Sequence, residues 1–277
     1  MTIQGLLDFG ADKLKLNKIK SSNLKSKILL MFVLNKQKEY LIINNKKQIL
    51  KEEENNYKKY LQQLVDGKPI QYITNMQEFF KLNFFVNENV LIPRQDTENL
   101  VEEVLKISKG KDNILDLCTG SGAIAISLFK NIANAKIIAT DISKKAIEIA
   151  KINAENNNAN IQFIISDLFE KVKDNKFDII VSNPPYIKSS EIEKLDNEVR
   201  NEPKLALDGG ADGLEFYKKI INASHKYLKK DGYLCLEIGY DQKESVINIL
   251  NNTNMYYNIY TKQDLARLDR IIVAELI

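Results

Sequence analysis

Short apolar segments alternate with amphipathic segments from Pro93 to the end of the chain, and this alternation restricts the possible folds more than any other feature. The apolar segments have the length of buried β-strands, and the segments between most of them have helical spacing. Strands that alternate with helices of this length form a parallel sheet, because each helix returns the chain to the same edge of the sheet. The sequence therefore predicts a doubly wound α/β domain with helices on both faces.

The elements of this domain follow from the same patterns. The predicted strands are Asn113–Cys118, Lys136–Thr140, Ile161–Ile165, Phe177–Ser182, Tyr233–Ile238, Tyr256–Tyr260 and Arg270–Leu276. The predicted helices are Thr97–Ser108, Gly122–Asn131, Lys144–Asn156, Leu214–Lys229 and Gln242–Leu250. Because no helix fits between the last two strands, we predict that the final strand is antiparallel.

Residues 1–73 are predicted to form a separate helical domain. Apolar residues recur at helical spacing around Leu6, Leu29 and Leu61. Gly67 then interrupts the pattern, as expected at the end of a helix. The block is too small and too rich in lysine to suggest chemistry of its own. We expect it to be a substrate-docking domain.

A linker over residues 74–92 is predicted to join the helical domain to an α/β domain that covers residues 93–277. Apolar side chains at Phe80, Leu82 and Phe84 recur at every second position. This period of two predicts a strand over residues 80–87, as one arm of a β-hairpin.

The composition is that of a soluble globular protein without a strong overall charge. The chain has 277 residues, of which 44% are hydrophobic and 28% charged, and its net charge is +3. No strong overall attraction to nucleic acid is indicated. Cys118 and Cys235 lie in apolar sequence and are predicted to be buried, reduced thiols. No apolar run approaches the ~20 residues that span a bilayer, and Asp8 does not suit a signal peptide. We expect a cytoplasmic protein without membrane association.

A glycine-containing turn follows the first predicted strand of the α/β domain. Gly120, Gly122 and Ala125 fit the pattern G-x-G-x-x-A between a strand and a helix. Glycines allow a ligand to approach the backbone closely, and a helix N-terminus attracts an anionic group. Asp141 ends the second strand at the spacing where a carboxylate can accept hydrogen bonds from ribose hydroxyls. A tight turn alone would not explain Asp141, so the pattern predicts an adenosine-containing ligand.

Two further carboxylates favour S-adenosylmethionine over a dinucleotide. Asp116, near the end of the first strand, would be badly placed beside a pyrophosphate but could hold an ammonium group. Asp167, just after the third strand, could accept a hydrogen bond from an adenine amino group. S-adenosylmethionine is cationic at its sulfur and its amine, whereas NAD carries two phosphates. His225, the only histidine, is predicted to lie within a helix in a surface or packing role.

The sequence Asn183-Pro184-Pro185-Tyr186 follows the fourth strand, at the edge where open α/β sheets bind ligands. The Asn183 side-chain oxygen and the Pro184 carbonyl can each accept one proton of a planar NH2 group. Pro185 stiffens the turn, and the Tyr186 ring can pack against a flat group. We interpret the four residues as a clamp that orients the nitrogen lone pair of a conjugated amino group towards a methyl carbon. A proline-rich turn would explain only the prolines.

Several stretches resemble the release factor glutamine methyltransferases of bacteria and organelles: "DLCTGSGAIAISL", "SNPPYI", "ALDGGADGLEFY", "EIGYDQ", "GKPIQYI" and "VLIPRQDTE". The resemblance extends from about Gly67 to the C-terminus. It implies a helical N-terminal domain, a β-hairpin and a seven-stranded class I methyltransferase domain. It also implies that the chain methylates the side-chain amide of the glutamine in the Gly-Gly-Gln loop of class 1 peptide chain release factors, which modulates translation termination. These factors would be its partners, without stable binding of nucleic acid.

The resemblance assigns roles to particular residues. Together with Asp116, the cofactor-binding residues would be Cys118, Thr119, Gly120, Ser121, Gly122, Asp141, Asp167, Leu168 and Asn183. The substrate-binding residues would be Asn183, Pro184, Pro185 and Tyr186, with Asn183 and Pro184 catalytic and no metal involved. Gln95, Asn75 and Lys81 depart from the family pattern, because Gln95 replaces a proline and the other two replace glycines near the hairpin. These departures can alter the linker or substrate docking and leave the catalytic interpretation unchanged.

Three alternatives remain open. N-P-P-Y or D-P-P-Y also occurs in enzymes that methylate an exocyclic amine of a nucleobase, but a broad basic face or a recognition insertion is then expected. An NAD-dependent oxidoreductase would fit the glycine pattern but not residues 183–186 or the lack of a suitable histidine. A non-catalytic binding module would leave the clamp unexplained.

Overall fold

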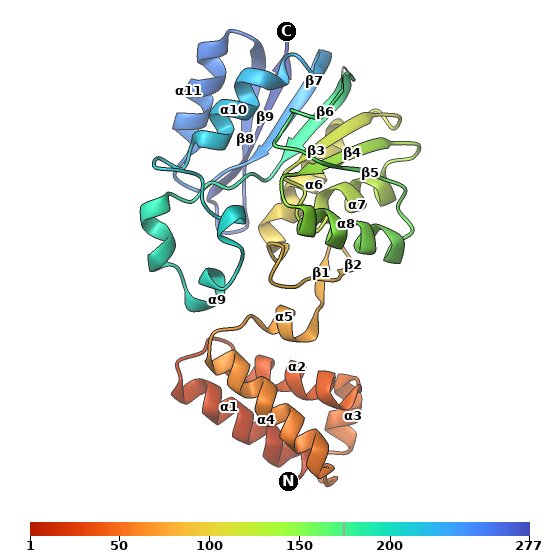
Figure 1. Cartoon of the computed structure of the whole chain (residues 1–277), viewed down its shortest axis with the longest axis vertical. Helices are drawn as coiled ribbons and strands as arrows, with labels where there is room; N and C mark the ends of the chain where they lie inside the picture. Colours follow the sequence, from red (N-terminus) through yellow and green to blue (C-terminus); the bar gives the residue numbers. More distant parts are fainter. Residues whose placement is uncertain (174) are drawn as a thin grey trace. The chain divides into compact units, whose positions relative to one another are not determined.

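The computed structural model describes residues 1–173 and 175–277, which divide into two compact units. Unit 1 contains Met1–Asn75 and Asp196–Asn201, and unit 2 contains Met76–Leu195 and Glu202–Ile277. Figure 1 labels the elements of both units in chain order. The segment Asp196–Asn201 is a part of unit 1 that the expected division at residues 73 and 92 does not include.

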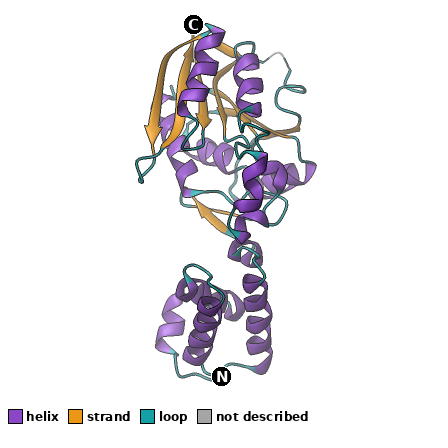
Figure 2. Ribbon diagram, turned by 90° about the vertical axis from the view of Figure 1, so that its left-hand side faces the viewer, coloured by secondary structure: helices purple, strands orange, loops and turns teal. Residues whose placement is uncertain are grey.

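Unit 1 is built from helices (Figure 2), and apolar side chains of these helices form one buried cluster. The helices are α1 (Ile3–Leu16), α2 (Ser22–Leu34), α3 (Lys38–Ile43), α4 (Lys51–Val65) and α5 (Ile70–Thr74). Leu6, Leu29 and Leu61 lie in one fully buried cluster, which confirms the three predicted helical segments. Thr2 caps α1, because its side-chain oxygen accepts a hydrogen bond from the Gly5 N–H at 3.1 Å.

The segment Asp196–Asn201 joins unit 1 through polar contacts. It contains the single-turn helix α9 (Asn197–Arg200). Lys20 forms an ion pair with Asp196 at 2.8 Å, and Lys25 forms another with Glu198. The Asn201 side-chain amide donates a hydrogen bond to the Gly67 carbonyl at 3.2 Å.

Unit 2 contains a seven-stranded sheet in the order β5-β4-β3-β6-β7-β9-β8. The strands are β3 (Asn113–Leu117), β4 (Lys136–Asp141), β5 (Gln162–Ile165), β6 (Phe177–Ser182), β7 (Leu228–Glu237), β8 (Tyr256–Gln263) and β9 (Asp269–Leu276). Strands β3 to β7 pair in parallel, and β9 is antiparallel to both of its neighbours, as predicted. The order reverses at β3, which is the switch point where such sheets bind ligands.

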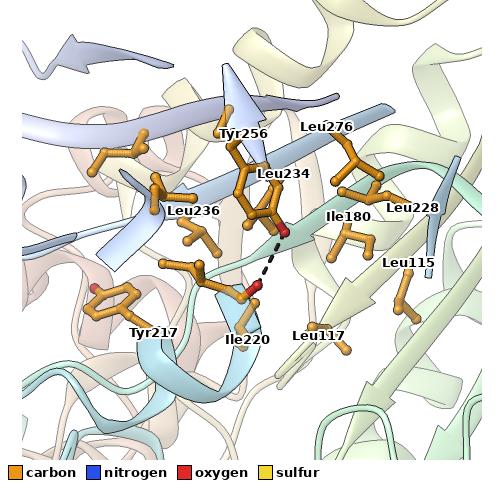
Figure 3. Packing of buried hydrophobic residues seen from close by; sticks show 14 of the residues in the cluster. Leu115, Leu117, Ile180, Tyr217, Ile220, Leu228, Leu234, Leu236, Tyr256 and Leu276 are labelled. Carbon is orange, nitrogen blue, oxygen red and sulfur yellow. Dashed lines mark hydrogen bonds between the residues drawn. The ribbon is translucent and has the colours of Figure 1, made fainter. Parts of the chain in front are cut away.

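Helices cover the sheet and bury its apolar side chains. They are α6 (Gln95–Ile107), α7 (Ala123–Asn131), α8 (Lys144–Asn156), α10 (Glu215–Ser224) and α11 (Lys243–Thr253), with the 3₁₀ turns Ser189–Lys194 and Lys204–Ala206. Figure 3 shows Leu115 and Leu117 of β3 packed in one cluster with Tyr217 and Ile220 of α10. Side chains alternate along a strand, so Asp116 points to the opposite face. The expected doubly wound α/β fold is confirmed.

The hairpin differs from its prediction. The single strand expected over residues 80–87 is instead the pair β1 (Gln77–Phe79) and β2 (Leu82–Phe84), joined by the turn Phe80-Lys81. Both turn residues have positive φ, 48° and 61°. A two-residue hairpin turn of type I′ requires this backbone and normally selects asparagine or glycine. Neither residue is a usual turn former, so the sequence gives no sign of a turn here. The alternation of apolar residues continues across it and was therefore interpreted as one strand.

The helix predicted over Leu214–Lys229 is also wrong at its end. Helix α10 stops at Ser224, and His225 is its half-buried C-cap. Strand β7 already begins at Leu228, because Phe177 pairs with Leu228 and its N–H donates to the Tyr227 carbonyl at 2.8 Å. The competing sheet pairing therefore ends the helix. Within the described residues, no helix has both the length and the apolar content to cross a membrane.

Candidate cofactor and substrate site

A cavity opens at the carboxyl ends of β3, β4, β5 and β6 in unit 2, the edge at which open α/β sheets bind ligands. Seven of the predicted site residues line it. They are Cys118, Gly120, Asp141, Asp167, Leu168, Asn183 and Pro185. The other predicted residues do not appear in its wall: Asp116, Thr119, Ser121, Gly122, Pro184 and Tyr186.

The glycine-containing turn brings the backbone to the cavity surface. Gly120 has a φ of +55°, and a Cβ atom added there would meet nothing within 4 Å. Its open side therefore allows a ligand to lie directly against the main chain. Cys118 also has a positive φ, 60°, and is half-buried at the cavity rather than fully buried as expected. Its place at the strand end, where the cavity opens, explains the difference.

Asp141 connects the ends of two strands. Its Oδ2 atom accepts a hydrogen bond from the Gly120 N–H at 2.9 Å, and Oδ1 accepts one from the Ser143 N–H at 2.8 Å. Each carboxylate oxygen has a second lone pair, so the side chain can still accept hydrogen bonds from a ligand in the cavity. Burial raises the pKa of Asp141, and the two backbone hydrogen bonds oppose this shift.

Asp116 is fully buried at the end of β3. The Thr119 hydroxyl donates to its Oδ2 atom at 2.6 Å, whereas Oδ1 has no hydrogen-bond partner among the described side chains and backbone groups. Burial raises the pKa of Asp116 to about 7, although the Thr119 hydroxyl and the Ala125 N–H oppose this shift. A buried carboxylate with an unpaired oxygen is costly unless a cation or donor approaches it. This chemistry fits the ammonium of an amino-acid-type cofactor.

The turn after β6 holds Asn183 at the cavity. The Ser182 hydroxyl donates to the Leu117 carbonyl at 2.8 Å and fixes the end of β6 against β3. The Asn183 side-chain NH2 donates to the Thr97 hydroxyl at 3.2 Å. Because the oxygen of a side-chain amide lies opposite its NH2, this contact leaves Oδ1 as a free acceptor for a ligand.

Tyr186 packs behind the turn, and its predicted contact with a substrate stays a prediction. Its half-buried ring packs against the core cluster on α10 and the sheet, and its hydroxyl lies 3.5 Å from Glu237 Oε1. The aromatic ring therefore supports the turn from behind instead of forming the wall of the cavity. Burial raises the pKa of the Tyr186 hydroxyl, and the Glu237 carboxylate raises it further.

Two residues without a predicted role hold this turn from outside. A Cβ atom on Gly209 would lie 2.6 Å from Tyr186 Cα, so only glycine fits there without a shift of the backbone. The Gln242 amide donates to the Tyr186 and Gly213 carbonyls at 2.9 and 3.1 Å. Both residues lie in stretches that carry the family resemblance, which is the signal that could have found them.

Other residues around the cavity were not predicted from the sequence, although Val90, Leu91 and Phe216 also lie in stretches that carry the family resemblance. An apolar wall comes from segments before α6 and after the turn: Val90, Leu91, Pro203, Leu205 and Phe216. Asn153 of α8 is fully buried and ties the hairpin exit to the glycine turn. Its side-chain NH2 donates to the Phe85 and Ser121 carbonyls at 3.0 and 2.9 Å.

Comparisons with known proteins agree with this architecture. The family "PrmC N-terminal domain" matches residues 5–74, and "Methyltransferase small domain" matches residues 95–202. A methyltransferase structure from Pyrococcus furiosus has a TM-score of 0.55 at 19% identity and covers 79% of this chain and 98% of that one. The 16S rRNA N2 G1207 methyltransferase of T. thermophilus, solved with AdoMet and guanosine, has a TM-score of 0.53 at 17% identity, covering 73% and 50%. At these identities the likeness concerns the fold alone.

Sequence relatives are much closer. The release factor glutamine methyltransferase of Clostridium acetobutylicum is 44% identical over 256 residues, which cover 90% of each chain. The protein of the same name from Geobacter sulfurreducens is 38% identical over 98% of this chain and 95% of its own length. Identity of this extent over nearly the whole length shows common family membership. The chain belongs to the release factor glutamine methyltransferase family.

Proposed function

We propose that the chain transfers a methyl group from S-adenosylmethionine to the side-chain amide nitrogen of a glutamine, in the Gly-Gly-Gln motif of class 1 peptide chain release factors. The observation that supports this most is the orientation of Asn183. Its NH2 is occupied by Thr97 at 3.2 Å, which leaves Oδ1 to accept a proton from a substrate amide. The named relatives make a release factor the first substrate to test.

S-adenosylmethionine supplies an electrophilic methyl group on a cationic sulfur. The site residues suit its functional groups: Asp141 for the ribose hydroxyls, Asp167 for the adenine amino group and Asp116 for the ammonium. The unpaired Oδ1 of Asp116 and the open side of Gly120 are the features of this chain that favour such a ligand. Thr119, Ser121 and Gly122 would shape the turn, whereas Cys118 and Leu168 would form part of the cavity wall.

The chemistry assigned to the chain is mainly orientation. An amide nitrogen is a poor nucleophile because its lone pair is delocalised. Asn183 Oδ1 and the Pro184 carbonyl would each accept one N–H of the glutamine amide, which draws electron density to nitrogen and points its lone pair at the methyl carbon. Well-oriented reactants can gain ~7–11 kcal/mol in this way. As the new C–N bond forms, the bond between the methyl carbon and sulfur would break and leave its electron pair on sulfur as a neutral thioether, and the nitrogen would then lose one proton to water.

The helical residues 1–73 would dock the release factor. Lysines outnumber acidic residues in this part of the chain, although the whole chain carries only +3. Such a surface favours a partner with acidic side chains near its Gly-Gly-Gln loop, because opposite charges steer association. The nucleobase, oxidoreductase and binding-module alternatives are not favoured by the family relationship.

The direct test is incubation of the purified protein with labelled S-adenosylmethionine and purified class 1 release factors. DNA, rRNA and tRNA serve as competing substrates, and a release factor with the Gly-Gly-Gln glutamine changed to asparagine is the matched control. Mass mapping should place one methyl group on that glutamine and none on the asparagine. Label in nucleic acid, with none in the release factor, would contradict the proposal.

A further inference from the structure

We propose that Thr97 and Glu237 are positioning residues for this reaction, because together they fix the side-chain amide of Asn183 with its oxygen towards the cavity. The inference rests on the proposed function, in which that oxygen accepts a proton from the substrate amide. Thr97 lies in α6 and Glu237 at the end of β7, so elements far apart in sequence meet behind the turn.

The hydrogen bonds run in one direction through Thr97. The Asn183 NH2 donates to the Thr97 hydroxyl oxygen at 3.2 Å. A hydroxyl has a single proton, and Thr97 is only 4% exposed, so this proton needs an acceptor inside the protein. The Thr97 hydroxyl is close enough to the Glu237 carboxyl to lower its pKa, and the Glu237 Oε2 atom is buried with no hydrogen-bond partner among the described residues, so it is available as that acceptor. The Thr97 proton therefore turns towards Glu237.

This direction determines which atom Asn183 presents to the substrate. An ionised carboxylate can only accept, so Thr97 must donate to Glu237 and accept from Asn183. If Thr97 donated to Asn183 instead, the amide would turn over and direct its NH2 into the cavity. Donors would then face the donors of a substrate amide, and the acceptor that orients the nitrogen would be lost. Glu237 is thus linked to Asn183 through two hydrogen bonds by way of Thr97. Because it is buried and can only accept, it selects the amide orientation that suits the reaction.

The surroundings of Glu237 make this control sensitive to pH. Glu237 is 2% exposed, and burial raises its pKa to about 7. The charged groups that act on it are Arg270 from β9, which lowers the pKa, and Asp96 from α6, which raises it. The Tyr186 hydroxyl lies 3.5 Å from Oε1, and the Tyr217 hydroxyl of α10 donates to the Glu237 backbone carbonyl.

Once Glu237 is protonated, the Thr97 hydroxyl would no longer be required to donate its proton to Glu237. Below its pKa the carboxyl can donate to Thr97, and the Thr97 proton is then free to bind Asn183 Oδ1. With saturating S-adenosylmethionine, kcat should therefore rise as the pH increases through about 7. Glu237→Gln, which can donate at every pH, should lower kcat at high pH and abolish this part of the profile.

The test combines these variants with a matched pair at Thr97. We expect Glu237→Gln and Thr97→Val to lower kcat on the release factor by roughly 10- to 100-fold, a smaller loss than the ~10²–10³ for a group that itself contacts the reacting atoms. The dissociation constant of S-adenosylmethionine should stay within about twofold, and Thr97→Ser, which keeps the hydroxyl, should restore kcat. Glu103→Gln is the control, because Glu103 is also a buried glutamate, 5% exposed, bonded to the Tyr260 hydroxyl outside the cavity wall.

The outcomes separate this inference from the proposed function. Unchanged kcat in Thr97→Val and Glu237→Gln, with an active wild type, would overturn the inference and leave the function intact. If the wild type methylates no release factor, the orientation of Asn183 is read directly by NMR. Cross-relaxation between the Asn183 NH2 protons and the Thr97 methyl group, lost in Glu237→Gln, would uphold the network, and its absence in the wild type would reject it. Thr97→Val keeps the test valid even if Glu237→Gln does not fold.

Discussion

Asn183 and Asp116 are the residues whose environments say most about the chemistry. The Asn183 NH2 donates to the Thr97 hydroxyl, so its amide oxygen is the atom that we propose faces the substrate. Asp116 carries an unpaired carboxylate oxygen in full burial, an arrangement that costs free energy until a donor or cation arrives. Residue types and spacing were enough to select both positions from the sequence. The Thr97 and Glu237 contacts could not be predicted, because they depend on how α6 and β7 pack.

Binding of S-adenosylmethionine should depend on pH through Asp116. Burial raises the pKa of Asp116 to about 7 in the free protein, and a bound ammonium would favour the charged form and lower it again. A ligand that binds the ionised form more tightly must release a proton below that pKa. We therefore expect the dissociation constant to fall as the pH rises from about 6 to 8. Calorimetry on the wild type and on Asp116→Asn measures this.

Asp116→Asn cannot ionise, so its affinity should be weaker at pH 8 and should change little over the same range. A wild type whose affinity does not vary with pH would remove the ammonium role from Asp116. The experiment also separates Asp116 from Glu237, because Glu237 should affect turnover at saturating cofactor and leave affinity unchanged.

At the scale of elements, the hairpin shows where local sequence and fold disagree. Lys81 has a φ of +61° in the turn between β1 and β2, and Asn75 at the end of α5 has a φ of +54°. The family resemblance implies glycine at both positions, and the positive φ values give a physical reason for it. Asparagine tolerates this backbone, whereas lysine is strained in it. Gln95 in turn begins α6 without a visible cost to the helix.

Lys81→Gly should therefore stabilise unit 2. Relief of left-handed strain gains about 1–2 kcal/mol, and the greater freedom of glycine in the unfolded chain removes about 0.5–1 kcal/mol of that gain. The net rise in the free energy of unfolding should be about 0.5–1 kcal/mol, as measured by chemical denaturation. Lys81→Ala keeps the Cβ atom and the strain, so it should match the wild type. A glycine variant that is no more stable than the alanine variant would disprove strain at this turn.

The spacing of apolar residues predicted most elements of unit 2, since buried strands and amphipathic helices each have a characteristic spacing. The errors arose where tertiary pairing overrode local preference. Leu228 pairs with Phe177 and ends α10 early, although the helical pattern continues. Tyr186 is not such an error: its ring packs on the core, Gly209 and Gln242 fix its turn from outside, and its contact with a substrate stays a prediction.

At the scale of the whole molecule, the chain consists of two units, and each unit combines two segments that are separated in the sequence. Asp196–Asn201 packs with the N-terminal helices through Lys20, Lys25 and Gly67. No pattern in the sequence predicts this, because single polar contacts leave no periodic signal. The segment is covalently joined to the stretch that supplies Pro203 and Leu205 to the cavity wall.

Removal of residues 1–73 tests the docking role of the helical unit. The cavity residues all belong to unit 2, so S-adenosylmethionine should bind the truncated protein with nearly unchanged affinity. Methylation of an intact release factor should fall mainly through a higher KM, because the docking surface is absent. A short Gly-Gly-Gln peptide should be methylated at similar rates by both forms. Equal KM values for the intact factor, on a truncated protein shown to be folded, would rule out the docking role.

The most direct test of the account is the turnover of Asn183→Ala on a release factor. The variant removes one of the two proposed acceptors, while Pro184 and the packed ring of Tyr186 remain. If this acceptor contributes as much as one oxyanion-hole donor, kcat should fall by about 100- to 1,000-fold. The dissociation constant of S-adenosylmethionine must be measured on the same protein, because Asn183 also lines the cavity. A large loss of kcat with the cofactor still bound is the predicted result, and near-normal turnover would contradict the clamp.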